Sequence, residues 1–80
     1  MQSRWEEAVA VNRAILEDFP SELEACNRLG KALSELGRNQ EAKEAFQWAL
    51  ETSPNNSIAR KNIERLERLG DAATVPGARG

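Results

Sequence analysis

The chain has 80 residues, 40% of them hydrophobic and 30% charged, with a formal net charge of −2. This composition predicts one small, soluble domain without a global attraction to nucleic acid. Histidine is absent and Cys26 is the only cysteine, which excludes histidine-based catalysis, an internal disulfide and a thiolate metal cage. No apolar run approaches the roughly 20 residues of a membrane helix, and the N-terminus lacks an apolar signal-peptide core. We therefore expect a cytoplasmic protein that is not an enzyme and uses no cofactor, metal or membrane.

The first predicted helix covers residues 4–18. Ser3 precedes it as the expected N-cap, Glu6 is its capping-box partner, and Pro20 follows the end of the helix. The residues of one face recur at spacings of three and four. They are Trp5, Ala8, Val9, Asn12, Ile15, Leu16 and Phe19.

The second and third predicted helices cover residues 22–36 and 39–52. Ser21 and Asn39 are the expected N-caps. Gly37 lies between the two helices and is expected to end the second one in a left-handed conformation. The predicted core faces contain Cys26, Leu29, Gly30 and Leu33 in the second helix, and Ala42, Ala45, Phe46 and Ala49 in the third.

The fourth predicted helix covers residues 57–69, after the breaker sequence Ser-Pro-Asn-Asn at 53–56. Gly70 is expected to end it. Residues 71–80 contain glycine, proline and small side chains without a period, which predicts a flexible tail or linker outside a helical domain at 3–70. The short connections favour antiparallel neighbours.

The chain also aligns with itself after a shift of 34 residues. The shift superposes a small core position, a large core position and a helix breaker: Ala8 on Ala42, Leu16 on Leu50, and Pro20 on Pro54. A period of 34 residues built from two helices resembles the tetratricopeptide repeat, whose pattern is W-x2-L-G-x2-Y, then A-x3-F, then P. The corresponding residues here are Cys26, Leu29, Gly30 and Leu33, then Ala42 and Phe46, then Pro54, with Ala49 at a further small position. Cysteine replaces the usual tryptophan and leucine the usual tyrosine.

The resemblance implies an all-α fold of four antiparallel helices, a fragment of a right-handed α-α superhelix. One full repeat at about 23–56 is flanked by two half repeats. Glycine costs about 1 kcal/mol inside a helix, so Gly30 implies a close contact that offsets this cost. The resemblance further implies that Gly30 and Ala42 let the paired helices approach, and that Ala49 makes room for the next repeat.

A non-catalytic interaction or scaffold module is the predicted function, with self-association as the first hypothesis. About three repeats are usually needed for independent stability, and the first helix lacks the partner helix of its own repeat. Either the chain is a piece of a longer protein, or a second copy covers the exposed apolar face, in which case a symmetric homodimer is the default oligomer. The candidate residues for this contact are Trp5, Val9, Val11 and Trp48.

Peptide binding is the alternative. In tetratricopeptide proteins the first helix of each repeat lines a concave groove, and the second and fourth predicted helices of this chain correspond to those helices. Amide and cationic side chains on the second and fourth helices would suit an acidic segment or a C-terminal carboxylate, although the full carboxylate clamp of some family members is not present. The candidates are Asn27, Lys31, Ser34, Lys61, Arg65 and Arg68.

A third hypothesis, contact with nucleic acid, rests on the basic fourth helix. Arg60, Lys61, Arg65 and Arg68 outnumber the two glutamates there and could contact phosphates. However, these cations have glutamates at helical pairing distance, and no aromatic side chains are interleaved for base stacking. The sequence therefore favours a protein or peptide partner over nucleic acid.

Overall fold

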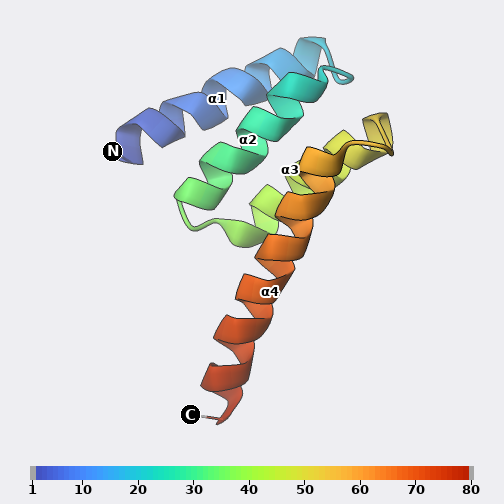
Figure 1. Ribbon diagram of the computed structural model, residues 1–80. Coiled ribbons are helices and arrows are strands. Elements are labelled where there is room, and N and C mark those ends of the chain that lie inside the picture. Colours follow the sequence, from blue (N-terminus) through green and yellow to red (C-terminus); the bar gives the residue numbers. More distant parts are fainter. Residues whose placement is uncertain (1, 80) are drawn as a thin grey trace.

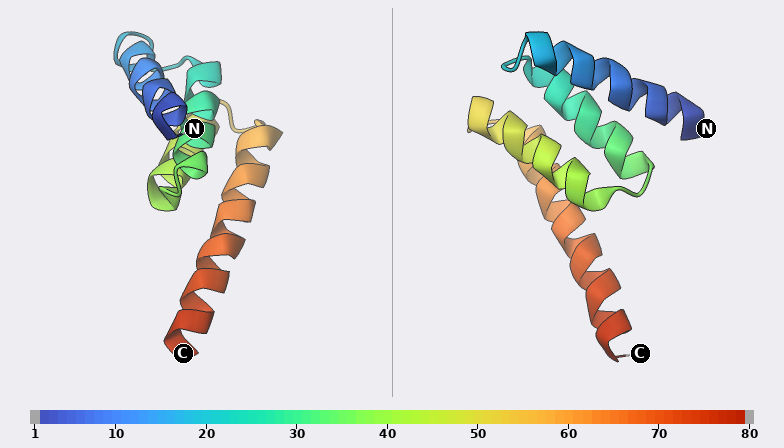
Figure 2. Two further views of the ribbon diagram at one scale, coloured as in Figure 1. Left: turned by 90° about the vertical axis from the view of Figure 1, so that its left-hand side faces the viewer. Right: turned by 180° about the vertical axis from the view of Figure 1, so that it is seen from behind.

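The structure, a computed structural model, consists of four helices, each antiparallel to the next along the chain (Figure 1). It describes the backbone of residues 2–79 and the side chains of residues 4–69. The helices are α1 (Gln2–Asp18), α2 (Leu23–Glu35), α3 (Asn39–Thr52) and α4 (Ser57–Arg79). The views in Figure 2 show α2 between α1 and α3, and α4 packed on α3. The described backbone contains no strand, so the predicted all-α helical-repeat fold is confirmed.

The starts of the first three helices differ from the predicted caps. Ser3 lies inside α1. Ser21 lies in a turn closed by the Glu22 amide donating to the Phe19 carbonyl at 3.0 Å, so Glu22 instead takes the extended backbone that precedes α2. Arg38 takes the corresponding place before α3. Neither Glu22 nor Arg38 caps its helix through its side chain.

The end of α2 follows the sequence prediction. Gly37 has a φ of +79°, the left-handed conformation that glycine adopts without strain. Its amide donates to the Ser34 carbonyl at 3.0 Å, and the Arg38 amide donates to the Leu33 carbonyl at 2.9 Å. These two bonds form a Schellman motif, which satisfies two carbonyls at the helix end and turns the chain directly into α3.

The fourth helix is longer than predicted, which corrects its expected end at Leu69. Helical backbone continues through Gly70 to Arg79. Helix propensity does not explain this extension, because Gly70 and Gly77 each cost about 1 kcal/mol inside a helix and Pro76 costs about 3 kcal/mol. The role of residues 71–80 as a flexible tail or linker stays a prediction, and residue 80 lies outside the described residues. No described helix is long and apolar enough to span a membrane.

The core confirms why small residues recur in the central helices. The Gly30 position faces the ring of Phe46 so closely that an added Cβ would lie 2.6 Å from its Cζ. Ala42 and Ala49 have no exposed surface, so they keep α3 close to its neighbours. Among residues 4–69, the buried hydrophobic residues are Val9, Leu16, Ala25, Cys26, Leu29, Ala32, Leu33, Ala42, Ala45, Phe46, Ala49, Ala59, Ile63 and Leu66.

Candidate functional site

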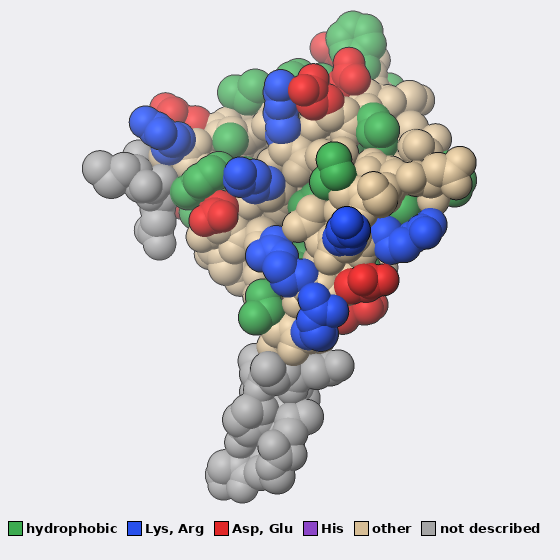
Figure 3. All heavy atoms as spheres, in the orientation of Figure 1, with side chains coloured by type: hydrophobic (Ala, Val, Ile, Leu, Met, Phe, Trp, Pro, Cys, Tyr) green, Lys and Arg blue, Asp and Glu red, His purple; other side chains and the backbone are tan. Residues whose placement is uncertain are grey.

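A hollow of about 530 Å³ lies between α2 and α4; we call it the α2–α4 groove. It exists because both helices pack on α3 and the side chains of neither fill the space between them. Figure 3 shows Lys and Arg side chains gathered over the face that these two helices present. The residues that line the groove are Glu24, Asn27, Arg28, Lys31, Ser34, Glu35, Phe46, Ile58, Asn62 and Arg65.

Four of the six predicted groove residues line this hollow: Asn27, Lys31 and Ser34 from α2, and Arg65 from α4. Lys61 and Arg68 do not line it, although both are exposed on α4. Spacing along α4 does not separate them from the lining residues, because Lys61 lies three residues after Ile58 and Arg68 three residues after Arg65.

Sequence reasoning missed part of the lining. Asn62 and Ile58 line the groove but were not among the predicted groove residues. Ile58 is one of the exposed large hydrophobic residues of the chain. The spacing of Ile58, Asn62 and Arg65 could have indicated a shared face, but it could not show that this face lies opposite α2.

Hydrogen bonds orient the α4 side of the groove. The Asn62 amide nitrogen donates to the Ile58 carbonyl at 2.8 Å, and the Arg65 guanidinium donates to Asn62 Oδ1 at 3.0 Å. Arg65 is therefore held near the groove with guanidinium N–H groups left over for another acceptor.

The α2 side combines a paired cation with polar groups that have free capacity. Arg28 pairs with Glu24 at 2.9 Å. Among the described side chains, Lys31 forms no ion pair, and the buried Asn27 Oδ1 has no hydrogen-bond partner. The lining contains three cations and two carboxylates, so the groove has donors suited to a carboxylate.

The predicted self-association residues do not form a single surface. Val11 on α1 is 57% exposed and Trp48 on α3 is 37% exposed, whereas Trp5 is partly buried against the core. Val9 is only 6% exposed, which corrects its place among the surface candidates: it faces the core that α1 shares with α2. Phe19, interpreted from the sequence as part of the helix face, is 64% exposed beyond the end of α1.

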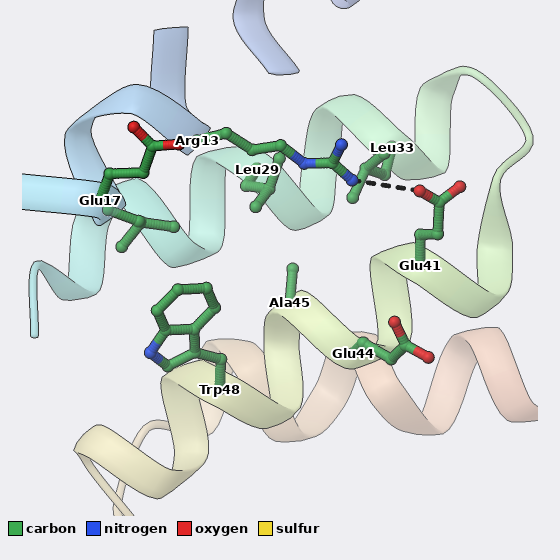
Figure 4. Close-up of a pocket in the computed structure, with 9 residues that line it drawn as sticks. Arg13, Glu17, Leu29, Leu33, Glu41, Glu44, Ala45 and Trp48 are labelled. Atoms are coloured by element: carbon green, nitrogen blue, oxygen red, sulfur yellow. Dashed lines mark hydrogen bonds and ion pairs between the residues drawn. The ribbon is translucent and has the colours of Figure 1, made fainter. Parts of the chain in front are cut away.

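A second hollow, of about 340 Å³, lies between α1 and α3 over α2; we call it the α1–α3 cleft. Figure 4 shows the Trp48 indole on one side of it and Arg13 reaching from α1 toward Glu41 of α3. The residues that line the cleft are Arg13, Leu16, Glu17, Leu29, Leu33, Glu41, Glu44, Ala45 and Trp48. No sequence signal identified this cleft, because its residues come from three helices.

Glu41 holds one end of the cleft together. It accepts two hydrogen bonds from Arg38, each 2.8 Å long, and one from Arg13 at 3.1 Å. These bonds from Arg38 and Arg13 lower the pKa of the Glu41 carboxyl. The Arg13–Glu41 pair is the one ion pair between two helices among the described side chains.

The single cysteine belongs to the core and not to a reactive site. Cys26 has no exposed surface. Burial raises the pKa of its thiol, which disfavours the nucleophilic thiolate. Its position on the apolar face of α2 is the one that the sequence pattern predicted.

Comparison with known proteins identifies the central helix pair. Residues 23–56 match the family model described as Tetratricopeptide repeat. No curated protein and no solved structure matches this chain significantly. The matched segment contains α2, the Gly37 turn, α3 and the turn before α4. Residues 23–56 carry this match, so the tetratricopeptide assignment rests on one repeat made of α2 and α3.

Proposed function

We propose that this chain is a protein-interaction module that holds a carboxylate-bearing peptide segment of a partner in the α2–α4 groove. Tetratricopeptide repeats are in general non-catalytic interaction modules, and the match at 23–56 supports that role. The observation that carries the proposal is one hollow lined by Asn27 and Lys31 from α2 and by Arg65 from α4.

The two cationic groups among these three favour a carboxylate acceptor. Lys31 and Arg65 donate charge-assisted hydrogen bonds, which are stronger than those between neutral groups. Ile58 supplies an exposed apolar contact in the same groove, so a ligand with one apolar and one acidic side chain would use both features. Both helices are fixed by packing on α3, so the binding groups are largely preorganised.

An amide NMR titration tests the groove. The probe is acetyl-Ala-Leu-Glu-Glu-Leu with a free C-terminal carboxylate, and the comparison is the same peptide with a C-terminal amide. We expect saturable shifts on α2 and α4 at millimolar concentrations, with weaker binding of the amidated peptide. Hydrogen bonds to charged groups contribute about 1.5–3 kcal/mol, so Lys31→Ala and Arg65→Ala should each weaken binding about tenfold.

Arg68→Ala is the matched control. Arg68 has the charge of Arg65 and lies one turn further along α4, but it does not line the groove. Its replacement should leave the affinity nearly unchanged. Equal effects of the two arginine replacements would mean that the peptide senses only the general charge of α4, and the groove proposal would then be wrong.

Self-association through α1 is a second candidate, favoured by the exposure of Val11 and Phe19. Ile15 lies on the same flank of α1 and is only partly buried. An exposed apolar patch of this kind is typical of an interface. The occupant would be a second copy of the chain.

Sedimentation equilibrium across a concentration series tests this candidate. A mass near 8.9 kDa at every concentration would contradict it. A rising mass that Val11→Asp abolishes would support it. Ile58→Asp is the control, because Ile58 is equally exposed at 59% but lies on α4.

A further inference from the structure

The α1–α3 cleft combines an apolar interior with one exposed aromatic wall. Leu29 and Leu33 of α2 lie at its base, and Leu16 of α1 lies on one side. The opposite side is formed by Ala45 and Trp48 of α3 (Figure 4). The alanine is too small to fill the space next to the indole, so Trp48 keeps 37% of its surface exposed beside an unfilled hollow. Covering this surface with an apolar side chain would be favourable.

The rim of the cleft is acidic. Three glutamates and one arginine line it, and Arg13 is already paired with Glu41. Arg38 also pairs with Glu41. Within the part of the chain whose side chains are described, Glu17 and Glu44 form no ion pair. Two carboxylates with free hydrogen-bonding capacity therefore flank the apolar interior.

We propose that the α1–α3 cleft is a docking site for a basic amphipathic segment of a partner protein. One apolar side chain of the segment lies against Trp48, and neighbouring lysines or arginines pair with Glu17 and Glu44. The volume of about 340 Å³ is at the low end for ligand sites and suits one or two side chains. The two carboxylates would repel nucleic acid phosphates, so the charge favours a cationic protein segment.

This site is separate from the α2–α4 groove. The residues of α2 that reach the cleft, Leu29 and Leu33, differ from those that line the groove. The cleft selects cations and the groove selects carboxylates. A single chain could therefore hold two partner segments of opposite charge at the same time.

Trp48 fluorescence gives a direct test. A Trp5→Phe variant leaves Trp48 as the only tryptophan. The probe is the peptide acetyl-Lys-Lys-Leu-Ala-Lys-Lys-Leu-amide, and the comparison peptide has glutamate in place of every lysine. We expect a saturable blue shift of the emission with the basic peptide and none with the acidic one.

A pair of double variants separates the site from general charge. Glu17→Gln with Glu44→Gln removes the two free carboxylates. We expect this double variant to weaken binding by about twofold to thirtyfold, since exposed ion pairs contribute about 0.2–1 kcal/mol each. Glu7→Gln with Glu51→Gln changes the net charge equally on the same two helices, at exposed positions that do not line the cleft. This control should bind like the parent protein, and circular dichroism checks that every variant folds.

Three results would overturn the proposal. One is the absence of a blue shift at saturating peptide. Another is equal weakening by both double variants, which would mean that the peptide responds to net charge alone. The third is a blue shift that develops with protein concentration alone, together with a rising mass, because the occupant of the cleft would then be a second copy of this chain.

Discussion

Replacing Gly30 with alanine tests the close approach of α2 and α3. The added Cβ would lie 2.6 Å from Cε2 and Cζ of Phe46 and 2.8 Å from Cε1, whereas carbon atoms normally pack at about 3.5–4.0 Å. Phe46 is fully buried, so its ring cannot move away without disturbing the core. Overpacking of this kind costs about 1–3 kcal/mol, and alanine recovers about 1 kcal/mol of helix propensity. The expected net loss is therefore about 1 kcal/mol in the free energy of unfolding.

Urea unfolding followed by circular dichroism measures this loss. Gly37→Ala is the matched comparison, because it also replaces a glycine near the end of α2 with alanine, but its loss of stability has a different physical cause. A Cβ at Gly37 would meet nothing within 4 Å, and its cost of about 1–2 kcal/mol comes from the left-handed backbone. Phe46→Leu in the same protein separates the two causes, because a smaller side chain relieves only the contact at Gly30.

In the Phe46→Leu background, Gly30→Ala should cost nothing or even stabilise, while Gly37→Ala should keep its full cost. The coupling between positions 30 and 46 should reach about 1 kcal/mol, as for residues in direct contact. If Gly30→Ala raised stability in the parent protein, or cost the same in both backgrounds, the steric explanation of Gly30 would be refuted.

Three further predictions follow from the same structure. The pKa of Glu41 is lowered in the folded state, so its contribution to stability is present above its ordinary pKa of 4.5 and is lost as the pH falls through the folded-state value. The difference in urea midpoint between the parent and Glu41→Gln should therefore shrink on acidification from neutral pH. A difference that stays constant with pH would contradict the pairing. Cys26 is buried, so iodoacetamide should label it at least about a hundredfold more slowly in the folded protein than in urea. Rapid labelling in the absence of denaturant would contradict its burial. Asn12 is only 5% exposed, and its Oδ1 has no partner among the described groups, although its amide nitrogen donates to the Ala8 carbonyl. Asn12→Leu should therefore raise the free energy of unfolding by about 1 kcal/mol. A lower stability of this variant in thermal unfolding would show that another group, such as a bound water, satisfies the amide.

The fold could be predicted from the sequence because few residues determine it. Gly30, Ala42 and Phe46 lie at the points where α2 and α3 touch, and their spacing in the sequence is the spacing of the repeat. The bounds of α3 were predicted fully, and those of α2 to within one residue at each end. The residue that precedes α2 was predicted wrongly as Ser21. Ser21 lies in a turn closed by a backbone hydrogen bond from Glu22, and no sequence motif marks this turn.

The candidate groove could be predicted only in part. Asn27, Lys31 and Ser34 follow a helical period on the face of α2 opposite the core, so periodicity alone identified them. On α4, the rotation of the helix relative to α2 determines which of its cationic side chains line the groove. That rotation is set by how Ala59 and Ile63 pack on α3, which no single helix reveals.

The α2–α4 groove and the α1–α3 cleft each lie between helices that occupy equivalent positions in the repeat. A shift of 34 residues relates α1 to α3 and α2 to α4, and in each case one helix of the chain packs between the two equivalent ones. The exposed side chains that face such a gap are not part of the core, so replacing them should cost the fold little. This freedom explains why Lys31 and Arg65 face one gap while Glu17 and Glu44 face the other. The packing residues carry the match to the repeat family, and we expect the exposed residues at the two gaps to select the partners.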